Sequence, residues 1–122
     1  MVKLTSLNSQ NIAAVLKSGR RYPSRSLLVF VRRVDAGRQG RLAVIAPKRL
    51  GLAVRRNRCK RLLRAGFAQV AREEGSSIYD NYDIILMATE RTDQASSLQL
   101  ADELKRVFAK LVQDTPPPAE GN

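Results

Sequence analysis

Residues 48–64 carry the strongest structural signal in the chain and read Lys-Arg-Leu-Gly-Leu-Ala-Val-Arg-Arg-Asn-Arg-Cys-Lys-Arg-Leu-Leu-Arg. From Val54 to about Ala71 the apolar residues recur at helical spacing, which predicts an amphipathic helix behind a basic loop over 48–51. On a helical wheel of ~100° per residue, one side gathers polar residues: Asn57, Lys60, Arg61 and Arg64. The other side gathers Cys59, Leu62, Leu63, Gly66 and Val70. We therefore expect one face to pack on a core and the other to present cations.

Upstream of this helix, the pattern predicts one helix and a pair of strands. A helix over roughly 9–18 follows several N-capping residues and ends at a glycine. Strands are expected over 26–34 and 41–46, with a polar turn at 37–40 that would join them as a hairpin. Another short strand near 20–22 is compatible with the pattern.

Downstream, the apolar run 82–88 is typical of a well-buried strand, and a second amphipathic helix is expected over about 95–112. Residues 114–122 form a Pro-rich tail that we expect to be disordered. Residues 1–113 are then a single domain with element order α-β-β-(β)-α-β-α. This order predicts an α/β (α+β) two-layer sandwich.

Charge is distributed very unevenly along the 122 residues, whose net charge is +11. Sixteen of the basic residues lie between Lys17 and Arg64, where Asp35 is the only acid. From Glu73 onward ten of the eleven acids face only four basic residues. Such a gradient predicts one face that binds a polyanion and another that is solvated.

Composition excludes several other classes of protein. The chain has no His, the commonest general base and metal ligand, and its single Cys59 cannot form an internal disulfide or a zinc site. The longest apolar run, 27–31, is far too short to span a membrane, and the first residues lack the apolar core of a signal peptide. A soluble, cytoplasmic protein that binds no metal itself is the expectation.

The basic segment resembles the signature of the protein component of bacterial ribonuclease P. That family has Lys-Lys-x-Gly-x-Ala-Val-x-Arg-Asn-Arg-x-Lys-Arg-x-x-Arg, which is met by Lys48-Arg49, Gly51, Ala53-Val54, Arg56-Asn57-Arg58, Lys60-Arg61 and Arg64. The likeness extends from about Leu4 to Leu111. It implies an α/β sandwich in which the basic helix makes an unusual left-handed β-α-β crossover.

The resemblance also implies a function and its partners. In this family a large RNA, using Mg²⁺, removes the 5′ leader of precursor tRNA, and the protein binds that RNA and holds the leader between the first helix and the sheet. Residues expected to bind the catalytic RNA are Lys48, Arg49, Arg56, Asn57, Arg58, Lys60, Arg61 and Arg64. Those expected to line the leader cleft are Phe30, Ile12 and Leu16. No residue of this chain is expected to be catalytic, and neither DNA nor a membrane is an expected partner.

This sequence departs from the family pattern at several cleft positions. Ile12 and Leu16 stand where the family commonly has Phe, and aliphatic side chains cannot stack on a base. Pro47 and Leu52 replace a usual Ser and Asn, and Glu90 is an acid where a base is expected. These changes affect the expected leader cleft more than the expected contact with the catalytic RNA.

Plainer interpretations apply to several residues. Phe30 is as compatible with a core as with a cleft, whereas Ile12 and Leu16 fit a core better. Cys59 is interpreted as a small buried hydrophobe and Arg55 as a solvated flank of the helix. Asp35, Glu73 and Glu74 are interpreted as surface charges, and Tyr82-Asp83 as the entry to a strand.

Other functions also remain open. A ribosomal-type RNA-binding module would use the same basic helix without a leader cleft. A DNA-binding protein would need a helix-turn-helix pair or a dimerisation element, and neither is visible. A nuclease acting without RNA would need a catalytic constellation that the sequence does not offer.

Overall fold

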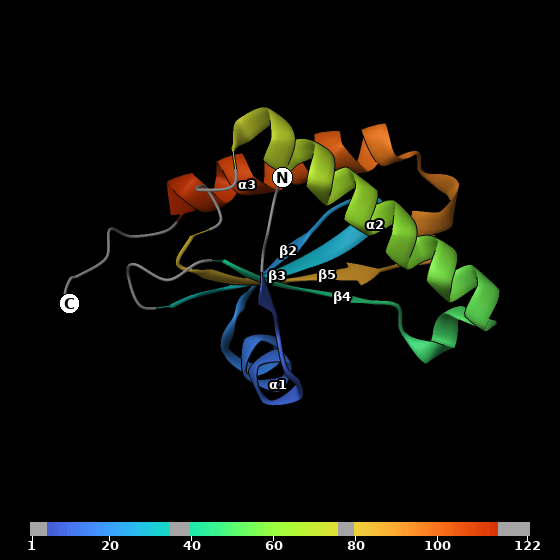
Figure 1. The fold of residues 1–122 in the computed structure, drawn as a ribbon, viewed down its shortest axis with the longest axis horizontal. Coiled ribbons are helices and arrows are strands. Elements are labelled where there is room, and N and C mark those ends of the chain that lie inside the picture. Colours follow the sequence, from blue (N-terminus) through green and yellow to red (C-terminus); the bar gives the residue numbers. More distant parts are fainter. Residues whose placement is uncertain (1–4, 35–39, 76–79, 115–122) are drawn as a thin grey trace.

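The computed structural model describes residues 5–34, 40–75 and 80–114 (Figure 1). Within them the chain alternates short strands and helices. The elements are β1 (Thr5–Ser6), α1 (Ser9–Ser18), β2 (Arg20–Pro23), β3 (Leu27–Arg33), β4 (Arg41–Ile45), the 3-10 turn η1 (Lys48–Leu50), α2 (Ala53–Glu74), β5 (Tyr82–Ala88), the 3-10 turn η3 (Thr92–Gln94) and α3 (Ser97–Asp114).

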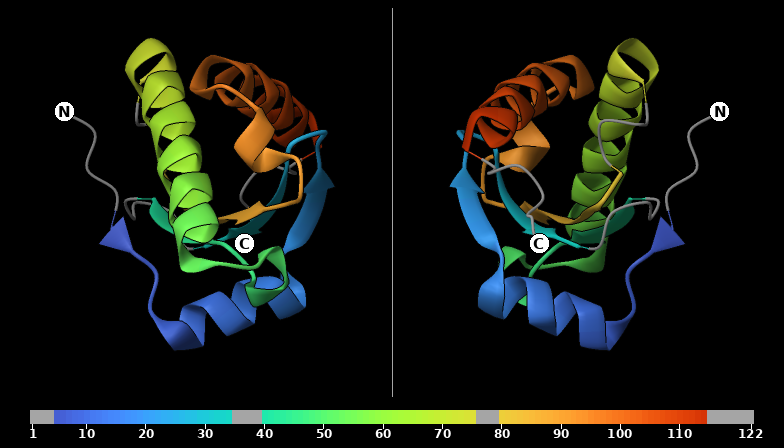
Figure 2. Two further views of the ribbon diagram at one scale, coloured as in Figure 1. Left: turned by 90° about the vertical axis from the view of Figure 1, so that its right-hand side faces the viewer. Right: turned by 90° about the vertical axis from the view of Figure 1, so that its left-hand side faces the viewer.

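A five-stranded mixed sheet in the order β1-β4-β5-β3-β2 forms the middle of the described structure. β5 is antiparallel to β3 and parallel to β4. Helices α2 and α3 cover one face of the sheet, and α1 lies across the other (Figures 1 and 2). The α/β sandwich expected from the sequence is confirmed, with α1 as a short layer on the second face.

The connection from β4 through α2 to β5 is left-handed. In the left view of Figure 2, α2 and α3 lie above the sheet, the parallel strands β4 and β5 run toward the viewer, and β5 lies to the right of β4. Seen from the α2 side with the strands pointing up, β5 is therefore to the left of β4. Crossovers of this kind are right-handed in the great majority of proteins. The family resemblance implied this unusual hand, and the arrangement of the elements agrees with it.

The expected hairpin between the strands at 26–34 and 41–46 is wrong. β3 and β4 are not neighbours, because β5 lies between them and pairs with both. β5 buries Asp83–Leu86 on both faces of the sheet, a pattern that belongs to a central strand. Most of the turn expected at 37–40 lies outside the described residues.

The other predicted elements are present with small shifts at their ends. Helix 9–18 and strand 82–88 coincide with α1 and β5, and the extra strand near 20–22 is β2. The sequence pattern did not reveal β1, which is only two residues long. The expected tail at 114–122 lies outside the described residues except for Asp114, the last residue of α3.

The larger core lies between the sheet and the pair α2–α3. Cys59 is fully buried there, which confirms its interpretation as a small hydrophobe, and burial raises the pKa of its thiol. Phe67 and Phe108 meet edge to face, with ring centroids 6.2 Å apart. Helices α2 and α3 approach each other closely at Gly66, where the Cβ of any other residue would lie 2.9 Å from the Cβ of Leu100.

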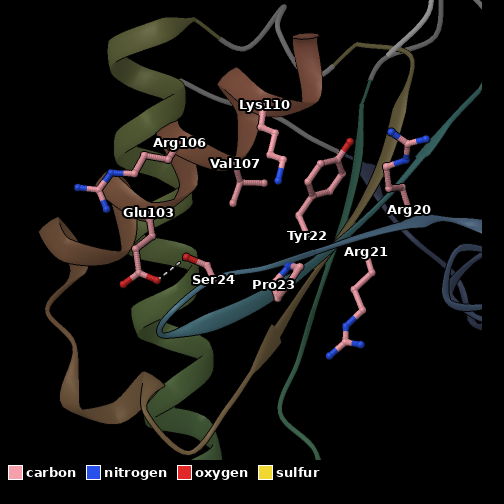
Figure 3. A pocket seen from close by; sticks show the side chains of 9 residues that line it. All are labelled: Arg20, Arg21, Tyr22, Pro23, Ser24, Glu103, Arg106, Val107 and Lys110. Carbon is pink, nitrogen blue, oxygen red and sulfur yellow. Dashed lines mark hydrogen bonds between the residues drawn. The ribbon is translucent and has the colours of Figure 1, made fainter. Parts of the chain in front are cut away.

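A buried carboxylate ties the β2–β3 turn to α3 (Figure 3). Glu103 is 4 % exposed, and its Oε1 accepts hydrogen bonds from the Ser24 hydroxyl at 2.7 Å and the Ser26 backbone N–H at 2.8 Å. Its Oε2 accepts one from Gln99. Neutral donors thus satisfy this charge.

None of the described helices combines the length and apolar character that crossing a membrane requires.

Candidate nucleic-acid interface

The outward face of α2 is a row of cations and one amide. Asn57, Arg58, Arg61 and Arg64 are exposed, while Arg56 and Lys60 are half-buried at the margins of the row. Within the described residues, none of Asn57, Arg58, Lys60, Arg61 and Arg64 has a carboxylate partner. The charges of the four basic residues are therefore available to a ligand, and guanidinium groups suit the paired oxygens of a phosphate.

The N-terminus of α2 adds to this positive field. Its N-cap, Leu52, makes no side-chain hydrogen bond to the first turn, and that turn contains no acid. The positive end of the helix dipole is therefore not compensated within the helix itself. Gly51, just before it, has φ of 101°, a left-handed conformation that favours glycine over other residues.

Arg55 braces the start of α2, so its interpretation as a solvated flank is wrong. Its Nε donates to Asp93 at 2.9 Å, and its Nη groups donate to the carbonyls of Leu50 and Glu90. The hydrogen bond to Asp93 raises the pKa of Arg55. Arg56 is tied in a similar way, because its Nε donates to the carbonyl of Ala46 at 3.0 Å.

The two basic residues of η1 differ in their surroundings. Lys48 is exposed and has no ion-pair partner among the described residues. Arg49 is held by Glu90, whose two carboxylate oxygens both accept from Arg49 Nη1, at 2.8 and 2.6 Å. This hydrogen bond lowers the pKa of Glu90, so its carboxylate stays ionised beside Arg49. An acid thus occupies the place that a phosphate would take on Arg49.

The residues expected to line a cleft lie on the α1 side of the sheet. Ile12 and Phe30 are partly buried against a small core formed by Leu7, Val15 and Ile85. Leu16 points outward, with 38 % of its surface exposed. The structure thus brings Ile12 and Phe30 to one core and leaves Leu16 at its edge.

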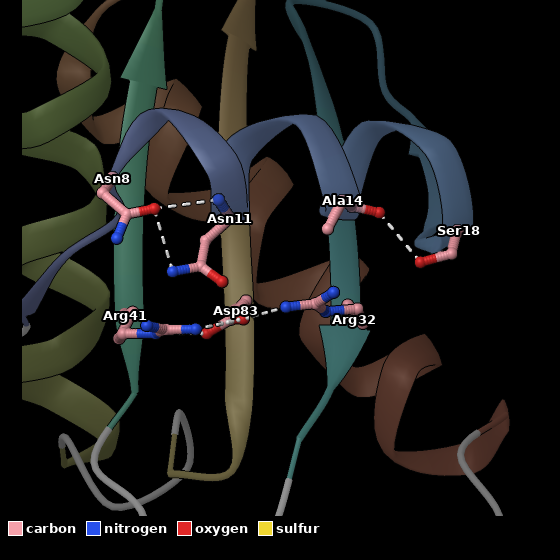
Figure 4. Close-up of polar contacts among 7 residues, drawn as sticks. All are labelled: Asn8, Asn11, Ala14, Ser18, Arg32, Arg41 and Asp83. Carbon is pink, nitrogen blue, oxygen red and sulfur yellow. Dashed lines mark hydrogen bonds and ion pairs between the residues drawn. The ribbon is translucent and has the colours of Figure 1, made fainter.

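Asp83 organises a charged cluster on the same side of the sheet (Figure 4). It is fully buried, and it accepts from Arg41 Nε and Nη2, both at 2.8 Å, and from Arg32 Nη2 at 3.0 Å. The hydrogen bond to Asp83 raises the pKa of Arg41. Sequence reasoning treated Asp83 as the entry to a strand. The available signal was a single acid inside an otherwise apolar strand, which needs cationic partners.

The acidic side chains of the described residues do not gather into a possible metal site. These residues contain no group of three or more His, Cys, Asp or Glu side chains that could hold a metal ion. Glu73 pairs with Lys105, which lowers the pKa of Glu73 and raises that of Lys105.

A sequence profile for Ribonuclease P matches residues 3–112. The chain belongs to the ribonuclease P protein family. Curated relatives named ribonuclease P protein component include one from Exiguobacterium sibiricum, 26 % identical over 97 residues and covering 80 % of each chain. Another, from Pseudomonas syringae pv. tomato, is 29 % identical over 98 residues, covering 80 % of this chain and 70 % of the relative.

Solved structures of ribonuclease P proteins share the fold. The Staphylococcus aureus protein superposes with a TM-score of 0.70 at 24 % identity, covering 89 % of this chain and 96 % of that one. The Thermotoga maritima protein gives 0.68 at 18 % identity, covering 86 % and 96 %. Membership of the ribonuclease P family implies a role in tRNA processing, in association with an endoribonuclease and its RNA.

Proposed function

We propose that this chain binds the catalytic RNA of ribonuclease P through the outer face of α2 and promotes removal of the 5′ leader from precursor tRNA by that RNA. The supporting observation is the row Asn57, Arg58, Arg61 and Arg64, exposed on one helical face without carboxylate partners among the described residues. Bringing these charges together costs self-repulsion, which a bound polyanion relieves. Lys48 extends the row toward η1.

The proposal assigns the chemistry to the RNA. Mg²⁺ held mainly by that RNA would supply the activated water and stabilise the leaving oxygen. The protein's own contribution is to neutralise phosphates of the folded RNA close to the cleavage site, which lowers the concentration of free Mg²⁺ that the RNA needs. We expect this activity in the cytoplasm.

For the leader, we propose the α1 side of the sheet. Phe30 and Ile12 are half-buried against the small core on that side, and Leu16 of α1 is 38 % exposed. Arg32 and Arg41 lie on the same side with side chains 27 % and 17 % exposed, and two guanidinium groups share one carboxylate. A net positive charge therefore remains near the aliphatic surface. This would favour weak contact with a single strand and little base stacking.

Cleavage of a 5′-labelled precursor tRNA at low Mg²⁺ concentration tests the proposal. A bacterial ribonuclease P RNA is assayed alone, with this protein, and against the protein by itself. We expect cleavage at the mature 5′ end only when both are present. If the protein binds the RNA tightly but stimulates no cleavage with several ribonuclease P RNAs, the cofactor role is wrong and a ribosomal-type RNA-binding role replaces it. Cleavage by the protein alone would overturn the assignment of chemistry to the RNA.

A further inference from the structure

A cavity of about 280 Å³ lies between strand β2 and helix α3 (Figure 3). β2 is the last strand on its side of the sheet, and β4, which leads into α2, lies toward the other side (Figure 2). The β2–α3 pocket is therefore separate from the outer face of α2 and from the core beneath α1. Its lining residues are Arg20, Arg21, Tyr22, Pro23, Ser24, Glu103, Arg106, Val107 and Lys110.

Four of these residues are cations, and Glu103 is the only acid among them. In the view of Figure 3, the Lys110 side chain reaches into the space between Val107 and Tyr22, and Arg20 lies on the other side of the Tyr22 ring. Arg106 and Lys110 are exposed and lie one helical turn apart on α3. Neither of these two has an ion-pair partner within the described part of the chain.

The Glu103 carboxylate does not form an ion pair with the basic residues that line the pocket. Its oxygens accept from Ser24, from the Ser26 backbone and from Gln99, all neutral donors. Burial opposes ionisation of Glu103, but these hydrogen bonds hold its pKa below the ordinary value. The Arg21 side chain extends from β2 away from α3 (Figure 3), so the charges that this carboxylate leaves unbalanced beside the pocket are those of Arg106 and Lys110.

The pocket favours a phosphate over a peptide strand or a nucleobase. A protein strand adding to the edge of β2 would meet Pro23, which has no N–H to donate, and adjacent arginines. A stacked base would need an open aromatic face, whereas Tyr22 is 4 % exposed. The Lys110 ammonium lies between Val107 and the buried Tyr22 ring in the view of Figure 3, and the exposed Arg106 lies one turn away on α3, so the pocket offers positive charge without an open ring, which suits a phosphodiester.

We propose that the β2–α3 pocket binds a backbone phosphate of RNA, as a second contact that is independent of the α2 face. The identification of the polyanion as RNA rests on the proposed function. Because this contact involves a phosphate and no base edge, it strengthens binding without sequence preference. The phosphate comes either from the catalytic RNA or from the precursor tRNA.

The test compares two double variants with the same change of charge. Arg106→Gln with Lys110→Gln removes two pocket cations at exposed positions, and Arg72→Gln with Arg91→Gln removes two exposed cations elsewhere. Dissociation constants are measured over a salt series, separately for ribonuclease P RNA and for precursor tRNA. We expect the pocket variant to weaken binding several-fold and to flatten the log–log salt slope by about one to two for one of the two RNAs, which identifies the source. The control should change the slope by less than half as much.

A third variant separates this inference from the proposed function. Arg58→Gln with Arg61→Gln is measured alone and combined with the pocket variant. If Arg58→Gln with Arg61→Gln leaves the dissociation constants unchanged while the pocket variant weakens binding, the proposed α2 interface is wrong and the pocket contact is supported. If the pocket variant matches the Arg72 and Arg91 control with both RNAs, the second contact is wrong whatever α2 does. Chemical-shift changes of the Tyr22 and Val107 amides on adding a uridine hexanucleotide would support the pocket directly, and their absence at saturation of α2 would count against it.

Discussion

The guanidinium of Arg41 donates two parallel hydrogen bonds to the carboxylate of Asp83, Nε to Oδ1 and Nη2 to Oδ2, each 2.8 Å long. The two residues are register partners in the parallel pair β4–β5. Asp83 is also the register partner of Arg32 across β3–β5. One buried carboxylate therefore fixes the alignment of the three central strands. A shift of one residue would place Asp83 on the other face, within the apolar core.

Replacing Asp83 with alanine is expected to destabilise the fold strongly. Arg41 and Arg32 would then share a partly buried site with no counter-charge, which costs about 2–4 kcal/mol in the free energy of unfolding. Urea denaturation followed by circular dichroism measures this. Asp80→Ala, at an exposed position just before β5, serves as the control and should change stability by less than about 0.5 kcal/mol. Equal stability of the two variants would show that the pairs contribute nothing.

Gly66 is required by the close approach of α2 and α3. Alanine at this position would improve helix propensity by about 1 kcal/mol, but its Cβ would lie 2.9 Å from Leu100 Cβ and 3.3 Å from the Ala101 backbone nitrogen. We expect the steric term to dominate, with a net loss of about 1–3 kcal/mol. Thermal unfolding of Gly66→Ala measures it, beside Arg72→Ala on the exposed side of the same helix. A stabilised Gly66→Ala would mean that the helices separate at little cost.

The fold could be predicted from sequence wherever a local period was strong. α1, α2, α3 and β5 have clear apolar spacing, and their bounds agree with the structure to within a few residues. Strand pairing could not be predicted in this way, because it depends on contacts distant along the chain. The sequence pattern therefore placed β3 beside β4, whereas β5, with Asp83–Leu86 buried, lies between them.

The candidate site could be predicted where it consists of one helical face. The wheel positions of Asn57, Arg61 and Arg64 follow from spacing alone, whereas Arg58 was expected at the interface from the family signature. The partners of Arg49, Arg55 and Asp83 could not be found, because each pair joins residues at least 38 positions apart. Composition showed that acids and bases occupy different halves of the chain, but only the fold shows which of them meet.

Arg58→Ala with Arg61→Ala is expected to weaken binding to ribonuclease P RNA and to flatten the salt slope by about one to two. Both side chains are exposed, so stability should stay within about 0.5 kcal/mol of the parent. Filter binding over a salt series gives the slope. Arg55→Ala is a contrasting variant, because that residue is engaged by Asp93 and should lower stability more than the slope. An unchanged slope in the double variant would exclude this face as the phosphate contact.

Glu90→Gln is expected to tighten RNA binding. In the parent protein, Arg49 Nη1 donates to the Glu90 carboxylate, and this exposed ion pair contributes little to stability. Without the charge, Arg49 can contact a phosphate, which should raise affinity a few-fold and steepen the salt slope by about one. The comparison runs at neutral pH, well above the lowered pKa of Glu90.

A double-mutant cycle isolates that effect. Arg49→Gln is combined with Glu90→Gln, and the gain from Glu90→Gln should disappear when Arg49 is absent. If the gain persists, Glu90 acts through its general repulsion of RNA and not through Arg49. If Glu90→Gln alone leaves affinity unchanged, Arg49 lies outside the interface.

The stability contributed by Glu103 should depend on pH in a defined direction. Burial opposes its charge, but the hydrogen bonds from Ser24, Ser26 and Gln99 bring its pKa below the ordinary value of 4.5. A group whose pKa is lower in the folded state stabilises that state above the unfolded-state pKa, and the contribution is lost as pH falls through the folded-state pKa. Glu103→Gln should therefore cost about 1 kcal/mol at pH 7, and the difference from the parent should shrink below pH 4.5.

Urea midpoints of the parent and Glu103→Gln between pH 3 and pH 7 measure this difference. Asp102→Asn, an exposed neighbour on α3, is the control and should differ little from the parent at any pH. Taking differences between variants removes the contribution of Glu73 and Glu90, whose pKa values are lowered as well by Lys105 and Arg49. A gap between parent and Glu103→Gln that grows as the solution is acidified has the wrong sign for a hydrogen-bonded carboxylate. It would mean that Glu103 is protonated in the folded protein and that the β2–α3 pocket carries more positive charge than its geometry implies.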